Sequence, residues 1–412
     1  MALPRSPLAP ERFPDLPAVA GVRSASAACG VRYPNRRDVV LFEMAESTAV
    51  AGLFTRSATA AAPVVWCQHA LQHSGGRGRA MLVNAGNANA FTGRRGDLAV
   101  NDEVAAVGAL LGCPAEQVYL ASTGVIGEAL PVERITGNVP ALADALTPGG
   151  WQAAADAIRT TDTFPKGAAK RVDMDGTHVT IAGIAKGSGM IQPDMATMLG
   201  FVFTDAKIAP DVLAAVLQDV NDETFNCITV DGDTSTSDTV LLAATGQAGH
   251  TRITDAGDGR LEAFRTALTD VMRDLAQQIV RDGEGAQKFV TVRVNGATDR
   301  LSARRIGFAI ANSPLVKTAI AGADPNWGRI VMAVGKAGEP ADRDRLAIAI
   351  GGIPVTRDGE AVPDYDEAPV QRHMSGREID IAVDVGVGEG GATVWTCDLT
   401  HGYIDINADY RS

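Results

Sequence analysis

Apolar residues recur along the chain at two spacings, which predict an alternation of helices and strands. Apolar positions three or four residues apart predict the clearest helix at 261–279, and further helices at 98–111 and 211–220. Short apolar runs and alternating runs predict strands, because successive side chains of a strand point to opposite faces. The predicted strands are 39–42, 80–83, 118–120, 178–184, 200–204, 289–295, 379–387 and 392–397.

Length and composition place this pattern in the α/β class. The chain has 412 residues, 46% apolar and 5% aromatic, which is enough for two or three domains and a substantial core. No linker of Gly/Ser or Pro-rich type and no low-complexity tract interrupts it, so one continuous globular body is expected. No apolar run has the length of a membrane span, and residues 1–16 lack the apolar segment of a signal peptide. We therefore expect a cytoplasmic protein.

Charge and ligand spacing argue against several classes of function. The net charge of −12 argues against a nucleic-acid surface, which needs clustered Lys and Arg. Five scattered cysteines without a C-x-x-C pair argue against a disulfide framework or a structural zinc site. His69 and His73 lie four residues apart, but the sequence around them supplies no acidic third ligand. No metal site is expected.

One segment, 386–391, matches the dinucleotide fingerprint G-x-G-x-x-G. That fingerprint needs a helix after the glycines, because the helix N-terminus binds the pyrophosphate. Here a strand-like run follows instead, at 392–397. The segment is therefore interpreted as a hairpin, and a nucleotide site is rejected.

Four polar segments have compositions that suit ligand binding. Residues 84–89 cluster amides and glycine, and 122–127 (S-T-G-V-I-G) can present N–H groups and a hydroxyl, as an oxyanion hole requires. Residues 225–238 predict a strand, an Asp-Gly turn and a run of hydroxyls and carboxylates. Glu284 stands between two glycines, so its carboxylate can be offered to a ligand. Each segment also fits an ordinary turn or a self-satisfied network.

The central stretch, 185–200, reads A-K-G-S-G-M-I-Q-P-D-M-A-T-M-L-G and holds one nucleophile candidate, Thr197. Glycines and Pro193 make its first part rich in turns, and its end is apolar. No histidine stands nearby to activate the hydroxyl. Local chemistry alone therefore favours a buried, structural threonine at this position.

In this order the segments resemble the ornithine acetyltransferase family of arginine biosynthesis. The resemblance is collinear from Gly21 to Ser412 and rests on several long motifs. The motifs are N-A-G-N-A-N-A (84–90), S-T-G-V-I-G (122–127), T-T-D-T-F-P-K (160–166), K-G-S-G-M-I-x-P-D-M-A-T-M-L-G (186–200), T-V-D-G-D-T-S-T (229–236), D-G-E-G-A-x-K (282–288), S-P-L-V-K-T-A-I-x-G-A-D-P-N-W-G-R-I (313–330) and Y-I-D-I-N-A-D-Y-R-S (403–412).

The resemblance implies that the precursor cuts its own backbone between Ala196 and Thr197. The freed α-amino group of Thr197, with a pKa of roughly 8, can then act as the base beside the hydroxyl. Thr197 Oγ1 would attack the acetyl group of N-acetylornithine, release ornithine and leave an acetyl ester. Glutamate would then take the acetyl group, giving N-acetylglutamate.

The resemblance also implies the remaining site residues. It places the oxyanion hole at Thr123 and Gly124, where the residues themselves suggest donors. Its substrate-contacting positions are Thr160, Lys186, Thr197, Glu284, Asn407 and Ser412. By charge, Lys186 suits a substrate carboxylate and Glu284 suits the ornithine δ-amino group.

The fold that comes with the resemblance is a layered α/β body of the N-terminal-nucleophile type, with mixed sheets packed between helices and a smaller C-terminal α/β part. Fragments 1–196 and 197–412 would be intertwined in one body and assemble as α2β2. No cofactor is expected, and no nucleic acid or membrane partner. The use of acetyl-CoA as a second acetyl donor is left open.

Some residues depart from the family pattern, and two other functions fit parts of the sequence. Ser412 stands where the family usually has Thr, Phe91 where Cys is usual, and Ser237 where Asn is usual. A self-cleaving amidohydrolase or aminopeptidase would use the same nucleophile with water as acceptor. A non-catalytic amino-acid-binding protein would keep an uncut chain and a structural Thr197.

Overall fold

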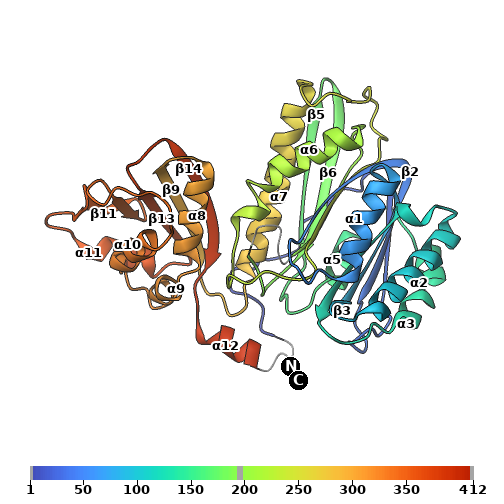
Figure 1. The fold of residues 1–412 in the computed structure, drawn as a ribbon, viewed down its shortest axis with the longest axis horizontal. Helices are drawn as coiled ribbons and strands as arrows, with labels where there is room; N and C mark the ends of the chain where they lie inside the picture. The colour runs from blue at the N-terminus through green and yellow to red at the C-terminus, as the bar shows by residue number, and fades with distance from the viewer. Residues whose placement is uncertain (1–2, 193–197, 409–412) are drawn as a thin grey trace. The chain divides into compact units, whose positions relative to one another are not determined.

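The computed structural model describes residues 3–192 and 198–408, which pack as two compact units. The larger unit comprises the described residues 11–192, 198–226 and 233–279, and the smaller one comprises 3–10, 227–232 and 280–408. Figure 1 colours the chain by residue number, from blue at the N-terminus to red at the C-terminus. Within the described ranges, none of the helices combines the length and the apolar character that crossing a bilayer demands.

The larger unit contains eight strands and most of the helices. Its strands are β1 (Val22–Ala27), β2 (Val39–Phe54), β3 (Arg77–Asn87), β4 (Val118–Val125), β5 (Lys166–Met174), β6 (Thr177–Lys186), β7 (Leu199–Thr204) and β8 (Thr239–Ala244). Its helices are α1 (Ala62–Ser74), α2 (Arg94–Leu111), α3 (Val132–Thr136), α4 (Val139–Asp144), α5 (Trp151–Ala157), α6 (Pro210–Asn221) and nearly all of α7 (Arg260–Arg281), with 3-10 turns at Ala115–Gln117 and Phe225–Cys227.

These strands form one mixed sheet in the order β4-β3-β2-β8-β7-β6-β5, with β1 paired to β2. The pairs β3–β4 and β7–β8 are parallel and the other neighbours are antiparallel. The central strands β7 and β8 therefore lie between β2 and β6. The predicted helices at 98–111, 211–220 and 261–279 and the predicted strands at 39–42, 80–83, 118–120, 178–184 and 200–204 are present, each longer than predicted.

The sheet bends at a bulge in β2. The pairing register with β3 shifts between Glu43 and Thr48, and Ser47 adopts a left-handed φ of 63°. Phe42, before the bulge, packs with its ring centroid 4.9 Å from that of Phe203 on β7. One face of the bent sheet thus encloses a core that also contains Trp151 of α5. Burying an aromatic or aliphatic side chain in such a core stabilises the fold by roughly 1.5–3 kcal/mol.

Helices cover the outer faces of this sheet. Val39 and Leu41 alternate with the inward residues of β2 and pack against a cluster that includes Val104 of α2 and Ile135 of α3. On β6, Gly183 faces α7: a side chain at Gly183 would come within 3.1 Å of Leu275. The predicted layered architecture, mixed sheets between helices, is confirmed (Figure 1).

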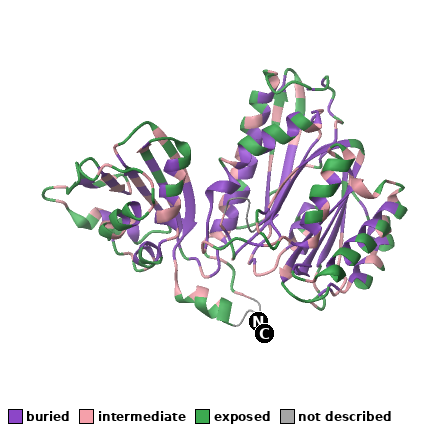
Figure 2. Cartoon of the chain, viewed as in Figure 1, coloured by how far each residue is buried: buried purple, intermediate pink, exposed green. Residues whose placement is uncertain are grey.

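The smaller unit is a second α/β body, as predicted for the C-terminal part. Its strands are β9 (Phe289–Ala297), β10 (Ala347–Ile350), β11 (Ile353–Arg357), β12 (Glu360–Ala361), β13 (Glu378–Asp384) and β14 (Gly390–Cys397), in the order β12-β11-β10-β13-β9-β14. Its helices are α8 (Arg300–Ala311), α9 (Pro314–Ala321), α10 (Trp327–Gly335), α11 (Glu367–Met374) and α12 (His401–Ala408). Figure 2 shows buried strands beside helices that expose one side.

Local sequence explains where several of these helices begin. Asp299 caps α8 by accepting a hydrogen bond from Ser302 N. Ser313 caps α9 in the same way, and Pro314 occupies the first helical position, where its missing N–H is harmless. The first cap starts the helix that packs against β9 and β14, and the second starts α9, whose Lys317 donates a hydrogen bond to Thr396 Oγ1 of β14.

Two local predictions are wrong. Residues 386–391 do not form a hairpin, because β13 and β14 lie on opposite sides of β9 and the segment crosses between them. A strand does follow the segment, as predicted. The predicted strand at 225 is a 3-10 turn, and Ile228 makes only an isolated bridge to Trp395. The Asp, Gly and hydroxyl residues that follow favour turns over a ladder.

Candidate active site

Three neighbouring strands of the larger unit end or begin at the same level. Lys186 is the last residue of β6 and pairs with Leu199, the first residue of β7, which in turn pairs with Thr239, the first residue of β8. The predicted cleavage site, Ala196 and Thr197, lies outside the described residues. Lys186, at the end of β6, and Met198, which directly follows the cleavage site, are both buried.

Thr123 and Lys186 are in direct contact. The Lys186 ammonium donates a hydrogen bond to Thr123 Oγ1 at 3.3 Å, and both residues are buried. Thr123 lies within β4, which extends to Val125 rather than ending at Leu120 as predicted. The structure thus brings together a predicted oxyanion-hole residue and a predicted substrate-binding residue.

Gly124 occupies a position that only glycine fits. Its φ is +134°, and a Cβ at this position would lie 2.3 Å from the carbonyl carbon of Gly86. Close approach of β3 and β4 therefore fixes the backbone beside Thr123. A side chain there would push the two strands apart.

The amide cluster at 84–90 is buried and makes hydrogen bonds to β4. Asn84 Nδ2 donates to Asn87 O at 2.9 Å, and Ser122 Oγ donates to Asn84 Oδ1 at 2.6 Å. All seven residues are buried, so a plain surface turn does not describe this segment. The cluster is an internal hydrogen-bond network that holds Ser122, the residue before Thr123.

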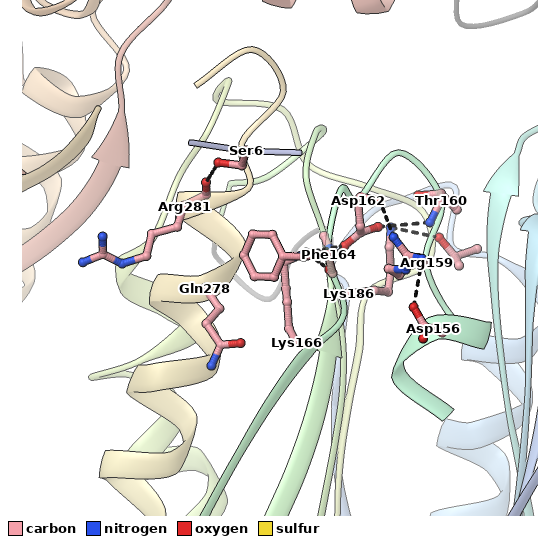
Figure 3. Close-up of polar contacts among 12 residues, drawn as sticks. Ser6, Asp156, Arg159, Thr160, Asp162, Phe164, Lys166, Lys186, Gln278 and Arg281 are labelled. Carbon is pink, nitrogen blue, oxygen red and sulfur yellow. Dashed lines mark hydrogen bonds and ion pairs between the residues drawn. The ribbon is translucent and has the colours of Figure 1, made fainter. Parts of the chain in front are cut away.

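Asp162, which sequence reasoning did not single out, organises the loop that carries Thr160. Its Oδ1 accepts from Lys166 Nζ and from Gly187 N, both at 2.7 Å, and its Oδ2 accepts from Thr160 N at 3.0 Å (Figure 3). Burial would raise the pKa of Asp162, but Lys166 and Lys186 together hold that pKa below its ordinary value. The only sequence signal was a carboxylate inside the T-T-D-T-F-P-K motif.

Asp238 is a second buried carboxyl that sequence reasoning did not single out. It directly precedes β8 and is 2% exposed. The N–H groups of Met198 and Ser235 and the Thr55 hydroxyl are close enough to favour its charged form, although none of these described groups meets strict hydrogen-bond geometry with its oxygens. Burial raises the pKa of Asp238 well above its ordinary value, and the opposing charge of Lys186 and nearby polar groups do not offset this effect.

In the smaller unit, the structure brings Glu284 and Asn407 together. Asn407 Nδ2 on α12 donates to Glu284 Oε2 at 2.7 Å, and Glu284 is buried. Gly285 permits this approach, because a Cβ there would lie 2.4 Å from Tyr403 N of the same helix. Thr400 Oγ1 also donates to Gly285 O at 2.7 Å. Ser412 lies outside the described residues.

The arrangement in the larger unit suits an anionic group. A buried ammonium beside a hydroxyl can bind a carboxylate or stabilise a negatively charged oxygen. No group of three or more metal-ligating side chains occurs within residues 3–192 and 198–408.

The fold and the site together define a class of protein: a mixed α/β protein in which buried polar groups lie where neighbouring strands of one sheet end. The ArgJ family model matches residues 23–412, so the chain belongs to the ArgJ family of arginine-biosynthesis enzymes. The arginine biosynthesis bifunctional protein ArgJ of Gluconobacter oxydans is 56% identical over 410 residues, which cover 100% of this chain and 96% of that protein.

Solved structures of the family are also similar. A crystal structure of arginine biosynthesis bifunctional protein ArgJ from Bacillus halodurans is 42% identical with a TM-score of 0.50, and the match covers 52% of this chain and 99% of that chain. An ornithine acetyltransferase from Mycobacterium tuberculosis, complexed with ornithine, is 34% identical with a TM-score of 0.38 over 43% of this chain and 93% of that chain.

Proposed function

We propose that the chain transfers the acetyl group of N-acetylornithine to glutamate through an acetyl ester on Thr197. The nucleophile forms when the precursor cuts its own backbone between Ala196 and Thr197. Membership of an arginine-biosynthesis family over nearly the whole chain supports the reaction class. The observation that carries the proposal is the buried contact of Lys186 with Thr123, because it joins two motifs that the reaction needs at one point.

Cleavage is supported by the way the strands flank the cleavage site. β6 precedes position 197 and β7 follows it, and the two strands pair from Ile181–Thr204 to Lys186–Leu199. A cut between them would leave both fragments held in one sheet. The solved Bacillus halodurans chain is also covered almost completely by about half of this chain, the fraction that residues 197–412 represent.

In the proposed transfer, the freed α-amino group of Thr197 takes the proton of the Thr197 hydroxyl, which attacks the acetyl carbonyl. The Thr123 hydroxyl and the Gly124 N–H stabilise the developing oxyanion. The proton then passes to the leaving amine of ornithine, and glutamate attacks the resulting ester in the reverse order of steps. No metal or bound cofactor takes part.

Charge assigns the substrate contacts. The buried Lys186 ammonium binds a substrate carboxylate, and Glu284 binds the δ-amino group of ornithine. Thr160, whose N–H is held by Asp162, Asn407, which contacts Glu284, and Ser412 complete the substrate-binding set. An amino-acid substrate carries charges of both signs, so it needs one residue of each kind.

The relatives are named bifunctional, which supports a second activity. We assign to it the acetylation of glutamate with acetyl-CoA as the donor. The cleaved protomer, with fragments 1–196 and 197–412, would associate as α2β2. Size-exclusion chromatography with light scattering tests this assembly, and a rate assay with acetyl-CoA tests the second donor.

The test of the main proposal is the denatured intact mass of the purified protein, with and without N-acetylornithine. Two fragments that meet at Ala196 and Thr197, with one acetyl group added to the second, are expected. An intact chain that never acetylates would contradict the proposal. Cleavage with release of free acetate and no transfer to glutamate would identify a hydrolase instead.

A further inference from the structure

We propose that Lys186 has a second role: through its contact with Thr123, it strengthens the hydrogen bond that the Thr123 hydroxyl donates to the developing oxyanion. This inference rests on the proposed function and adds to it a role for the Lys186 charge in the acetyl-transfer step itself. In this role Lys186 is a positioning residue, because it acts through Thr123 and not by touching the acetyl group.

The chemistry of the two side chains fixes the direction of their hydrogen bond. An ammonium can only donate, so Lys186 Nζ is the donor and Thr123 Oγ1 is the acceptor, at 3.3 Å. The bond occupies a lone pair of the hydroxyl oxygen and does not use the hydroxyl proton. Among the described residues, none accepts that proton from Thr123. The Thr123 hydroxyl can therefore donate to a group that arrives with the substrate.

The ammonium also makes this hydroxyl a stronger donor. A hydroxyl that accepts a hydrogen bond from a cation is polarised by it, and the polarisation strengthens the bond that the hydroxyl donates. The effect is larger where water is excluded, because a low local dielectric strengthens electrostatic interactions. Both side chains meet this condition, since Lys186 is 6% exposed and Thr123 is 8% exposed. The gain is greatest when the acceptor carries the negative charge of the oxyanion.

The protein holds Lys186 in place without the help of a substrate. Lys186 pairs with Leu199 at the end of β6, and the next residue, Gly187, donates its N–H to Asp162 Oδ1 at 2.7 Å. The charges of Lys166 and Lys186 hold the pKa of Asp162 below its ordinary value, so Asp162 carries a compensating negative charge. The burial of the Lys186 ammonium therefore does not depend on a substrate carboxylate.

The two roles of Lys186 predict different kinetics. A residue that only binds the substrate carboxylate acts equally on the ground state and the transition state, so its removal raises KM and leaves kcat unchanged. A residue that strengthens the oxyanion hole acts when the oxyanion forms, so its removal lowers kcat. Neither Lys186 nor Thr123 gives up a proton in this role, so the proton transfers of the proposed reaction stay as they are.

The test is the rate at which the protein gains one acetyl group at saturating N-acetylornithine, followed by denatured intact mass and expressed per cut protomer. Lys186→Met should slow this step by about tenfold, the difference between a charge-assisted and a neutral hydrogen bond. Lys186→Arg keeps the charge and the donors, so it should recover part of the rate.

A donor without a carboxylate provides a second measurement. N-acetylputrescine is N-acetylornithine without its carboxylate, so Lys186 cannot act on it by binding that group. Lys186→Met should slow acetylation by this donor by the same factor as acetylation by N-acetylornithine.

A double-mutant cycle checks that Lys186 acts through the Thr123 hydroxyl. In Thr123→Ala the hydroxyl is absent, so there is no donor for the ammonium to strengthen. Adding Lys186→Met to this variant should change the acetylation rate by less than about twofold, whereas independent roles would give the full tenfold loss again.

Lys317→Met is the matched control. Lys317 is a buried lysine of the smaller unit, and its ammonium also donates to a buried threonine hydroxyl, Thr396 Oγ1, at 2.9 Å. Folded, cut protein with this substitution should be acetylated at the unchanged rate. An equal loss of rate in Lys317→Met would show that a buried lysine supports the rate only through the fold, and it would overturn the inference.

The outcomes separate this inference from the proposed function. If Lys186→Met raises KM and leaves the saturated rate unchanged, Lys186 only binds the substrate, and the inference fails while the transferase proposal stands. Equal losses with and without the Thr123 hydroxyl overturn it in the same way. A folded Lys186→Met protein that stays uncut would assign Lys186 to the cleavage and would also overturn it. If the unchanged protein never gains an acetyl group, the proposed function itself fails.

Discussion

The Lys186 ammonium donates a hydrogen bond to Thr123 Oγ1, although four strands of the same sheet separate β6 from β4. In a flat sheet these two strands would lie roughly 24 Å apart, since neighbours are spaced by about 4.8 Å. The contact exists because the sheet folds over at the bulge of β2, where Phe42 meets Phe203. The bend, and not proximity in sequence, creates the site.

The first prediction concerns this contact. Thr123→Ala should lower turnover by about 10²-fold, as the loss of one oxyanion donor does. Thr123→Ser keeps the hydroxyl and should retain most of the activity. Steady-state rates with N-acetylornithine and glutamate measure both. An unchanged rate in Thr123→Ala would show that other residues form the oxyanion hole.

The second prediction concerns the nucleophile. Thr197→Ala should yield one uncut chain without transferase activity, because the same hydroxyl serves both steps. Gel electrophoresis and an acetyl-transfer assay check this. If the variant were still cut and still turned over substrate, another residue would have to be the nucleophile.

The third prediction concerns the fully buried pair of Asp162 and Lys166. Asp162→Asn should lower the free energy of unfolding by about 3–5 kcal/mol, because it leaves the Lys166 charge buried without a counter-charge. Denaturant unfolding measures the loss. Asp270→Asn is the control: it breaks an exposed pair with Lys170, and the free energy should change by less than about 1 kcal/mol.

The same pair predicts an acid dependence of stability. The pKa of Asp162 is lower in the folded protein than its ordinary value of 3.8, so its contribution is present above that value. The contribution is lost as the pH falls towards the folded-state pKa. Unfolding free energies between pH 6 and pH 3 (about the range that matters for an Asp) should therefore fall less in Asp162→Asn than in the unchanged protein.

Sequence reasoning located the elements that carry a clear period. The spacing of Leu261, Leu268 and Leu275 defined α7, and the apolar runs defined β6 and β7. The prediction of a hairpin at 386–391 was wrong, because the order of the strands depends on packing across β9, and the residues of the segment itself do not indicate that order. The residues themselves indicated one continuous body, because the chain crosses between the two units without a Gly- or Ser-rich linker; only the resemblance implied a smaller C-terminal part.

The candidate site was predicted only in part. Thr123, Lys186, Glu284 and Asn407 were named from the resemblance, and within each unit the structure brings their pairs together. Asp162 and Asp238 were missed, because the sequence does not distinguish a buried carboxylate in a polar segment from a solvated or helix-capping one. Their importance comes from complete burial, which depends on distant strands and cannot be inferred from neighbours in the sequence.

The fifth prediction concerns Glu103. Burial raises the pKa of this carboxyl from 4.5 to about 8, an effect to which Asp102 adds. A raised pKa means that stability is fully present below the ordinary value and is lost as the pH rises through the folded-state value. Glu103→Gln should therefore remove part of the decline in thermal stability between pH 5 and pH 8 (roughly the interval between the two pKa values). Identical pH profiles would show that Glu103 is solvated or paired.

The position of β7 and β8 between β2 and β6 bears on the lifetime of the enzyme. Residues 197–412 supply strands that are flanked on both sides by strands of residues 1–196, and each piece alone would expose open strand edges. If the proposed cleavage takes place, neither piece could be exchanged for a newly made one, and each molecule would keep the partner with which it was synthesised. The enzyme would then be renewed only by degrading both pieces and translating the whole chain again.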